Sequence, residues 1–444
     1  MATDPEMGEC RPPLSSSKAP LLASAASDDH MKLDLAVRRL ELFLSLLGFH
    51  QSRSPLTLLL CCCAFLLLGV AVPVVSVCLS GCWGDRCKAY EVGMFELFLL
   101  ASQVAVAVVS LVCVSLNLRK YGVRRFLFVD HDHGQLERFR KEYVKKIQDF
   151  FWLLFWWILP CLLVKTAREV VRFLYTQQES LWKSVVILVA SFVSWTYLTA
   201  IFLSGCALFN LVCNLQVIHF EDFGRLFERD VDVIQLLEEH VCLRHYLSKI
   251  SHRFRIYLLL IFFCVSASEV GTLFQTTGYS GIINFTNAGD FAVSFLSLVS
   301  SVVQVVGIIL CLHSAAKISH RAQGIASLAS KWHALVTCST DSPQLRLTDS
   351  SGNLQAVPCP MVTNYSESDL ESLDNTAVQT NFHLASHLSS YHKRASLVIY
   401  LQGNPGGITI FGWTVDRALI NTIFFIELSL VLFVLGKTIV FSTK

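Results

Sequence analysis

The stretch Phe411–Phe441, FGWTVDRALINTIFFIELSLVLFVLGKTIVF, decides how the rest of the chain is interpreted. Within it, Ala418–Gly436 is apolar and long enough to cross a bilayer, since about 20 helical residues span a ~30 Å hydrocarbon core. Glu427 stands at the centre of this segment, and Asp416 and Arg417 stand just before it. A charge at mid-membrane costs roughly 2.5–3.5 kcal/mol on insertion scales, so it normally faces a partner or a water-filled cavity. The pattern predicts a membrane-spanning helix that does more than anchor the chain.

The composition of the whole chain indicates an integral, multi-spanning membrane protein. Hydrophobic residues make up 53% of the chain and charged residues only 16%, against about 25% charged residues in a typical soluble protein. The net charge is +2 and no basic arm stands out, so we expect no nucleic-acid partner. Several of the sixteen cysteines lie in apolar runs such as residues 61–63, where a thiol acts as a small hydrophobe.

No motif of a soluble enzyme is present in the sequence. It has no P-loop, no paired-cysteine zinc spacing and no nucleophile elbow, so we expect neither an enzyme, nor a metal site, nor a cofactor. The run His131-Asp132-His133 has the donor atoms of a metal site, but three adjacent loop residues rarely converge on one ion. We interpret this run as a solvated loop.

Apolar runs divide the chain into an all-α membrane protein with seven transmembrane helices. We expect a disordered cytosolic tail over residues 1–30, and an amphipathic lead-in helix with transmembrane helices one to six over 31–337. A disordered cytosolic insertion over 338–380 and a re-entry segment with helix seven over 381–444 follow. The predicted spans are Pro55–Leu79, Glu91–Asn117, a third beginning at Phe150, Val185–Asn214, Ile256–Gly278, Phe291–His313 and Ala418–Gly436.

The distribution of Lys and Arg predicts the orientation. The loop Leu118–Asp149 holds nine of these residues, whereas the short loops Ser80–Tyr90 and Tyr279–Asp290 hold only Arg86 and Lys88 between them. The positive-inside rule then places the N-terminus in the cytosol and the C-terminus outside, opposite to a G-protein-coupled receptor. Apolar residues continue at helical spacing beyond the spans, so we expect helices four to six to extend into the cytosol.

Two features of the predicted outer loops can be tested by chemistry. Asn284 begins the glycosylation sequence Asn-Phe-Thr. Cys82 and Cys87 lie in CWGDRC, where they form either a disulfide or two free thiols.

The carboxylates inside the predicted spans have two interpretations. Glu269 lies near the middle of the fifth span and Glu427 near the middle of the seventh. Each is either neutral and hydrogen-bonded to a neighbouring helix, or part of an ion or ligand pathway. In the last helix, Asn421, Phe425 and Ser429 share one side at 100° per residue, and Glu427 lies roughly opposite.

Two segments resemble a known superfamily. They are GWTVDRALINTIFFIELSLVLFVLGKTI at Gly412–Ile439 and YGVRRFLFVD at Tyr121–Asp130. Together with seven spans and a cytosolic N-terminus, they resemble the insect odorant and gustatory receptors, and more closely their plant relatives, a family with a domain of unknown function. The resemblance implies a tetrameric cation channel whose last helices line a central pore, with cytosolic helix ends joining the subunits.

The last helix departs from the animal signature of that superfamily, which is Thr-Tyr, five apolar residues and Gln-Phe. Aligned on Thr422, this chain has Ile423, Ser429 and Leu430 where Tyr, Gln and Phe stand, and Glu427 interrupts the apolar five. Two functions are therefore favoured. One is a gustatory-receptor-like, ligand-gated cation channel subunit, and the other is a non-conducting membrane scaffold or signalling protein of the same fold.

For the channel, we expect a homotetramer in the plasma membrane or an endomembrane. Asn421, Phe425 and Ser429 would line the pore, and Glu427 would hold the helix against its own bundle. The expected partners are membrane lipid and a small-molecule ligand that the sequence does not identify. A proton-coupled transporter using Glu269 and Glu427 is a third possibility, but no repeat relates the two halves of the chain.

Overall fold

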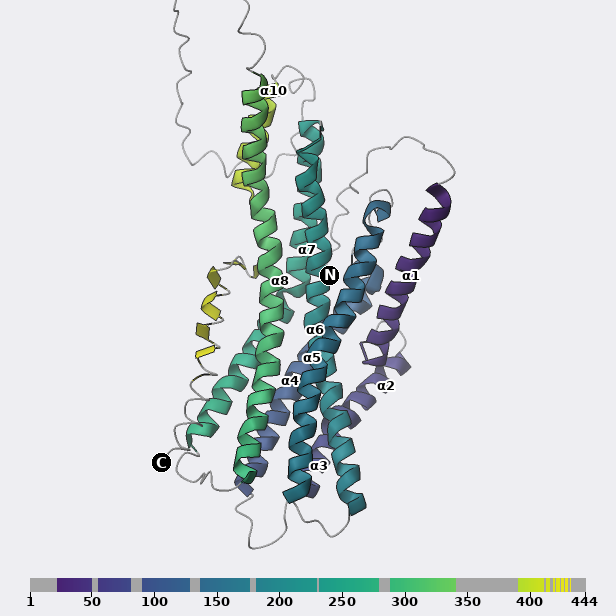
Figure 1. Cartoon of the computed structure of the whole chain (residues 1–444), viewed down its shortest axis with the longest axis vertical. Helices are drawn as coiled ribbons and strands as arrows, with labels where there is room; N and C mark the ends of the chain where they lie inside the picture. The colour runs from purple at the N-terminus through teal and green to yellow at the C-terminus, as the bar shows by residue number, and fades with distance from the viewer. Residues whose placement is uncertain are drawn as a thin grey trace, which may run out of the picture. The chain divides into compact units, whose positions relative to one another are not determined.

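The computed structural model describes the backbone of residues 22–49, 55–80, 90–127, 136–175, 181–229, 231–278, 288–340, 390–410 and 413–415, and of separate residues between 418 and 432. Ten helical segments and one pair of short strands are assigned within these residues (Figure 1). They are α1 Leu22–Leu46, α2 Pro55–Phe65, η1 Leu66–Ala71, α3 Val72–Ser80, α4 Tyr90–Phe126, α5 Leu136–Tyr175, α6 Leu181–Leu226, α7 Val233–Gly278, α8 Ala288–Thr340, α10 Ser390–Gly403, β1 Thr409–Ile410 and β2 Trp413–Thr414.

Six helices of the described chain are long and apolar enough to cross a membrane. Many of their large apolar side chains are exposed, for example Leu59, Phe155 and Phe263, as expected for surfaces that face lipid rather than water. The chain is therefore an almost entirely helical, multi-pass membrane protein. The six segments are Pro55–Ser76, Leu97–Phe126, Phe139–Leu163, Val185–Leu226, Val233–Thr272 and Val302–Cys338.

The first span contains a short π-helix, η1, just before Pro73. Proline has no backbone N–H, so the carbonyl of Gly69 loses the partner that a regular α-helix would give it. The wider turn of a π-helix accommodates such a mismatch. The effect of Pro73 is thus a local change of helix type over Leu66–Ala71.

The lead-in helix begins earlier than the sequence predicts. We expected it from Met31, but α1 starts at Leu22, so its first turns lie in the segment predicted to be disordered. Residues 22–27 are LASAAS, and the Ala and Leu in this run favour a helix. The apolar face of α1 packs on α5, with Leu40 and Leu44 fully buried and the rings of Phe43 and Phe151 5.4 Å apart.

Helices α6, α7 and α8 are much longer than a membrane requires. They contain 46, 46 and 53 residues, which is roughly 70–80 Å at 1.5 Å per residue, against a hydrocarbon core of ~30 Å. The third predicted span likewise belongs to one continuous helix, because α5 runs through Pro160 from Leu136 to Tyr175.

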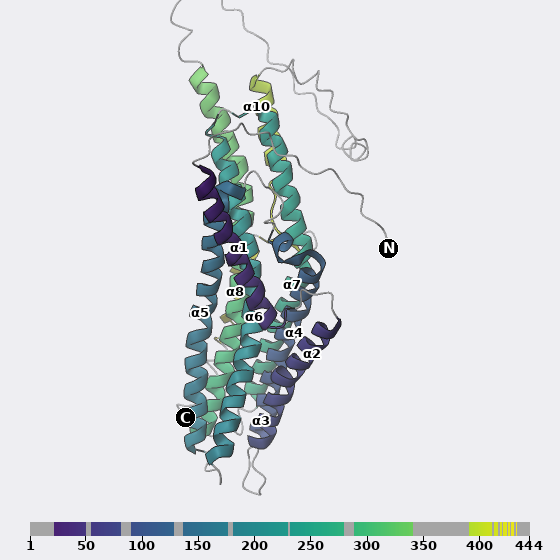
Figure 2. The ribbon, with the colours of Figure 1, turned by 90° about the vertical axis from the view of Figure 1, so that its right-hand side faces the viewer.

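The chain divides into two compact units. Unit 1 comprises residues 1–222, 241–322 and 406–444, and within it α5, α6 and α8 run side by side (Figure 2). Unit 2 comprises residues 223–240 and 323–405. Its core includes Leu397, Val398 and Leu401 of α10, and the ring of Tyr400 lies edge-on to His240 at 5.7 Å.

Candidate functional site

A small, mainly apolar cavity lies within unit 1 between α4, α6 and α8. It measures about 10 Å³, close to the size that one water molecule needs. Three of its wall residues, Gln103, Thr199 and Gln304, carry polar side chains, and each comes from a different helix. The other lining residues are Val106, Trp195, Leu198, Phe202 and Val303.

Gln304 is the most distinctive residue of this cavity. Its side chain is 2% exposed, and its Nε2 donates a 3.2 Å hydrogen bond to Oγ of Ser102. The Ser102 hydroxyl in turn donates to the carbonyl of Leu99 at 2.8 Å. The Oε1 of Gln304, however, has no hydrogen-bond partner among the described residues. A buried acceptor left unpaired costs roughly 1–3 kcal/mol, so the cavity favours a guest that donates a hydrogen bond.

The wall of the cavity depends on close contact between α6 and α8. A Cβ atom at Gly307 would lie 2.4 Å from the ring of Phe202 and 3.2 Å from Sγ of Cys206. Only glycine therefore allows the Phe202 ring to lie flush against α8 and close one side of the cavity.

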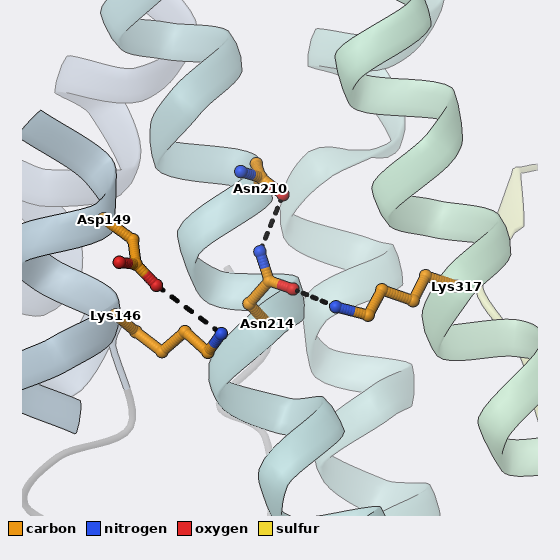
Figure 3. A network of polar contacts seen from close by, with 5 residues as sticks. All are labelled: Lys146, Asp149, Asn210, Asn214 and Lys317. Atoms are coloured by element: carbon orange, nitrogen blue, oxygen red, sulfur yellow. Dashed lines mark hydrogen bonds and ion pairs between the residues drawn. The ribbon is translucent and has the colours of Figure 1, made fainter. Parts of the chain in front are cut away.

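A row of polar side chains continues along the same pair of helices (Figure 3). Asn214 donates to Oδ1 of Asn210 at 2.8 Å and accepts from Nζ of Lys317 at 2.9 Å. Ser314 of α8 donates to the same oxygen of Asn210 at 2.7 Å. The α6 residues of this row, Asn210 and Asn214, are four apart and so lie on one face of that helix. Polar pairing thus joins α6 to α8 beyond the cavity.

Helix α5 adds an ion pair beside this row. Lys146 and Asp149 are 3.6 Å apart, and Lys146 extends from α5 toward α6 (Figure 3). On α8, one turn beyond Lys317, Arg321 pairs with Glu221 of α6 at 3.2 Å. Both pairs are partly exposed, so each contributes little stability by itself.

A two-stranded hairpin ties the start of the last helix to α7 and α8. The N–H of Ile408 donates to Oγ of Ser319 at 3.1 Å, and the N–H of Thr409 donates to Oγ of Ser251 at 3.2 Å. Strand β1 then pairs antiparallel with β2. The turn at 404–407 has φ of +67° at Gly406 and +148° at Gly407, values that glycine adopts without strain.

The residues predicted to line a pore are exposed on the last helix. Asn421 and Ser429 are exposed, and Phe425 is 63% exposed. The hydroxyl of Ser429 donates to the carbonyl of Phe425 at 2.6 Å, a local bond that lowers its cost in an apolar setting. This side of the helix is therefore left uncovered within the described part of the chain.

The other predicted site residues are distributed differently. Glu269 is buried in α7 with 1% exposure and has polar contacts. Asp416, Arg417, Glu427, Asn284, Cys82 and Cys87 lie outside the described residues, as does the run 131–133. In the described part of the chain, no group of three or more His, Cys, Asp or Glu side chains is placed to hold a metal ion.

The residues that join α6 to α8, and the two serines that hold the hairpin, are not predicted from the sequence. Asn210, Asn214, Gln304, Ser314 and Lys317 stand in predicted spans or helical extensions where polar residues are rare. For Asn210 with Asn214 and for Ser314 with Lys317, the spacing of four and three residues was the available signal, because it places each pair on one face of its helix. Ser251 and Ser319 carry no such signal, because their partner is backbone from a distant segment.

Comparison with known proteins gives a matching family and a similar solved structure. No curated protein matches the sequence. The structure of the insect olfactory receptor OR5 from Machilis hrabei is similar with a TM-score of 0.48 and 12% sequence identity, over 89% of this chain and 98% of the receptor. A family described as "Protein of unknown function (DUF3537)" matches residues 35–426. Because this match covers most of the sequence, the chain belongs to the DUF3537 family.

Proposed function

We propose that this chain is one subunit of a homotetrameric, ligand-gated cation channel whose last helix lines the ion path. The observation that carries the proposal is the exposure of Asn421, Phe425 and Ser429 on one side of that helix. Lipid offers no partner to an exposed amide, whereas a path for hydrated cations is lined by groups that replace water around the ion. The last helices of three further subunits would stand around the same path and enclose it.

The proposed topology has seven spans, with the described part of 418–432 belonging to the seventh. The N-terminus lies in the cytosol and the C-terminus outside, because Leu118–Asp149 and residues 225–255 carry the dense Lys and Arg. With this orientation, the excess length of α6, α7 and α8 lies in the cytosol.

The cavity between α4, α6 and α8 is the proposed ligand site. Gln304 presents an acceptor there that is buried and unpaired among the described residues, so a ligand with a hydrogen-bond donor would satisfy it. At about 10 Å³ the cavity is too small for an organic molecule, so binding would have to separate α6 from α8. A ligand that binds more tightly when α6 and α8 are apart would shift the equilibrium from the closed state to this wider state.

The hairpin connects that movement to the ion path. Ser319 lies on α8, the helix that carries Gln304, and it bonds the backbone of Ile408 just before the last helix. Displacement of α8 would therefore pull on the segment that positions Asn421. In this scheme α8 moves as a rigid body and carries the start of the last helix with it.

Reconstitution of the purified chain into planar bilayers tests the proposal. The expected result is a cation current that depends on a small molecule found by screening, from particles with the mass of a tetramer. A clean tetramer that passes no current under any condition would instead favour the non-conducting scaffold of the same fold. An Asn421→Leu variant, which keeps a similar volume without the amide, should reduce the current without changing the assembly.

A further inference from the structure

Cations gather where the end of α4 meets the middle of α7. Residues 118–127, at the C-terminal end of α4, contain Arg119, Lys120, Arg124 and Arg125 and no Asp or Glu. From α7, the guanidinium carbon of Arg253 lies 3.8 Å from the centroid of the Tyr121 ring. The ammonium of Lys120 lies 5.2 Å from the same ring. One aromatic ring thus holds cations from two helices close together.

The contacts around Arg253 fix the two helices at this level. Asn117 donates to the carbonyl of Arg253 at 3.1 Å, and Arg253 donates from Nη1 to the carbonyl of Arg125 at 3.4 Å. The rings of Phe126 and Phe254 are 5.4 Å apart. These bonds position the Arg253 side chain, so the cationic surface is built into the packing of α4 on α7.

The surrounding sequence adds positive charge to this surface. On α7, exposed Lys249 precedes Arg253 by one turn, and residues 240–268 contain no Asp or Glu. Asp34 of α1 forms an ion pair with Arg124 at 3.0 Å. The end of α4 and the facing turns of α7 thus carry six cations, of which one is paired with this carboxylate: Arg119, Lys120, Arg124, Arg125, Lys249 and Arg253.

Each of the two helices continues from the cluster as an exposed apolar lane. On α4, the exposed residues Val108, Val112 and Leu116 lead at four-residue spacing to Lys120. On α7, Ile256 and Phe263, 53% and 68% exposed, follow Lys249 on one face. The cluster lies at the C-terminal end of α4 and in the middle of α7. The α4 lane therefore extends from the cluster toward the N-terminus of α4, the α7 lane extends toward the C-terminus of α7, and both lie in the spans.

We propose that this surface, Arg119, Lys120, Lys249 and Arg253 with the apolar lanes beside them, binds an anionic phospholipid. The charge and the apolar lanes together match a molecule with a phosphate at one end and acyl chains at the other. A guanidinium and neighbouring ammonium groups form charge-assisted hydrogen bonds to phosphate oxygens, which also screens the repulsion among them. Clusters of four to eight Lys and Arg at the cytosolic end of a span are typical of sites for acidic lipid headgroups.

Native mass spectrometry of the full chain in detergent, titrated with single lipids, tests the proposal. Phosphatidylserine should bind with higher affinity than phosphatidylcholine. The triple variant Arg119→Gln, Lys120→Gln and Lys249→Gln should lose about fivefold in phosphatidylserine affinity for each cation removed. All three side chains are exposed, so the variant should keep the wild-type circular dichroism spectrum and elution volume.

Two further arms define the site. A matched control removes three exposed lysines elsewhere, Lys141, Lys145 and Lys331, and should bind phosphatidylserine like the wild type. The pair Leu116→Ser and Ile256→Ser should weaken phosphatidylserine binding and leave soluble glycerophosphoserine binding unchanged. An equal loss of phosphatidylserine affinity in both triple variants would overturn the site, because the lipid would then be attracted by positive charge anywhere on the protein. An unaffected Leu116→Ser and Ile256→Ser pair would overturn lipid docking in favour of a headgroup-only site.

Discussion

The backbone N–H of Ile408 donates to Oγ of Ser319 over 3.1 Å, and both residues are almost completely buried. This bond joins the segment before the last helix to α8. The Ser319 hydroxyl thus accepts from the buried N–H of Ile408, which precedes strand β1 and would otherwise lack an acceptor. The backbone at Ile408 and Thr409 is therefore positioned by α7 and α8 through Ser251 and Ser319.

We expect Ser319→Ala to destabilise the protein. The N–H of Ile408 would remain buried without its acceptor, which costs roughly 1–3 kcal/mol. Thermal unfolding of the purified protein in detergent measures the loss. Ser327→Ala is the control, since that exposed hydroxyl bonds only the Gly324 carbonyl of its own helix among the described contacts. Equal melting temperatures for the two variants would show that the hairpin bond contributes nothing.

The Gly307→Ala substitution should disturb the contact between α6 and α8. Its new methyl group would meet the Phe202 ring at 2.4 Å, and overpacking of this kind costs roughly 1–3 kcal/mol. Gly324→Ala is a matched change on the same helix with no atom within 4 Å of the new Cβ, so it should stabilise by up to about 1 kcal/mol. The comparison is made by thermal unfolding, and a Gly307→Ala variant as stable as Gly324→Ala would refute the contact.

Gln304→Leu is expected to leave stability unchanged or to raise it. The substitution removes a buried amide whose Oε1 is unpaired among the described residues, while Ser102 keeps its bond to the Leu99 carbonyl. The same change should weaken the response to any activator that binds in the cavity, because the acceptor is lost. Melting temperature and activator dose–response are the two readouts. A variant that melts earlier yet responds normally would assign Gln304 a purely structural role.

The pairing of Asn214 with Lys317 can be measured by a double-mutant cycle. Asn214→Ala and Lys317→Met each remove one partner of the 2.9 Å hydrogen bond shown in Figure 3. We expect a coupling free energy of about 0.5–1 kcal/mol, at the low end for contacting residues, because this bond is exposed. Strictly additive effects on the free energy of unfolding would mean that the two side chains do not interact.

Most of the membrane architecture could be predicted from local sequence, because a run of about 20 apolar residues has few alternatives to a spanning helix. Two local features were not predicted, because neither changes the pattern of apolar residues. They are the π-helix over Leu66–Ala71 and the start of α1 at Leu22. The cavity could not be predicted, because its wall depends on the contact between Gly307 and Phe202, which are far apart in the sequence. The hairpin was missed for the same reason, because its serine partners lie on the distant helices α7 and α8.

The exposed side of the last helix is the central element of the account, and Asn421 is the residue to test. A tetramer would place four copies of Asn421 around the path, and a ring of carboxylates there attracts cations. Unitary conductance of reconstituted Asn421→Asp, with Ser327→Asp on α8 as the control, is the most direct measurement. The account predicts a changed cation conductance or selectivity in Asn421→Asp and none in Ser327→Asp. A tetramer whose current is identical in both variants and the wild type would contradict it.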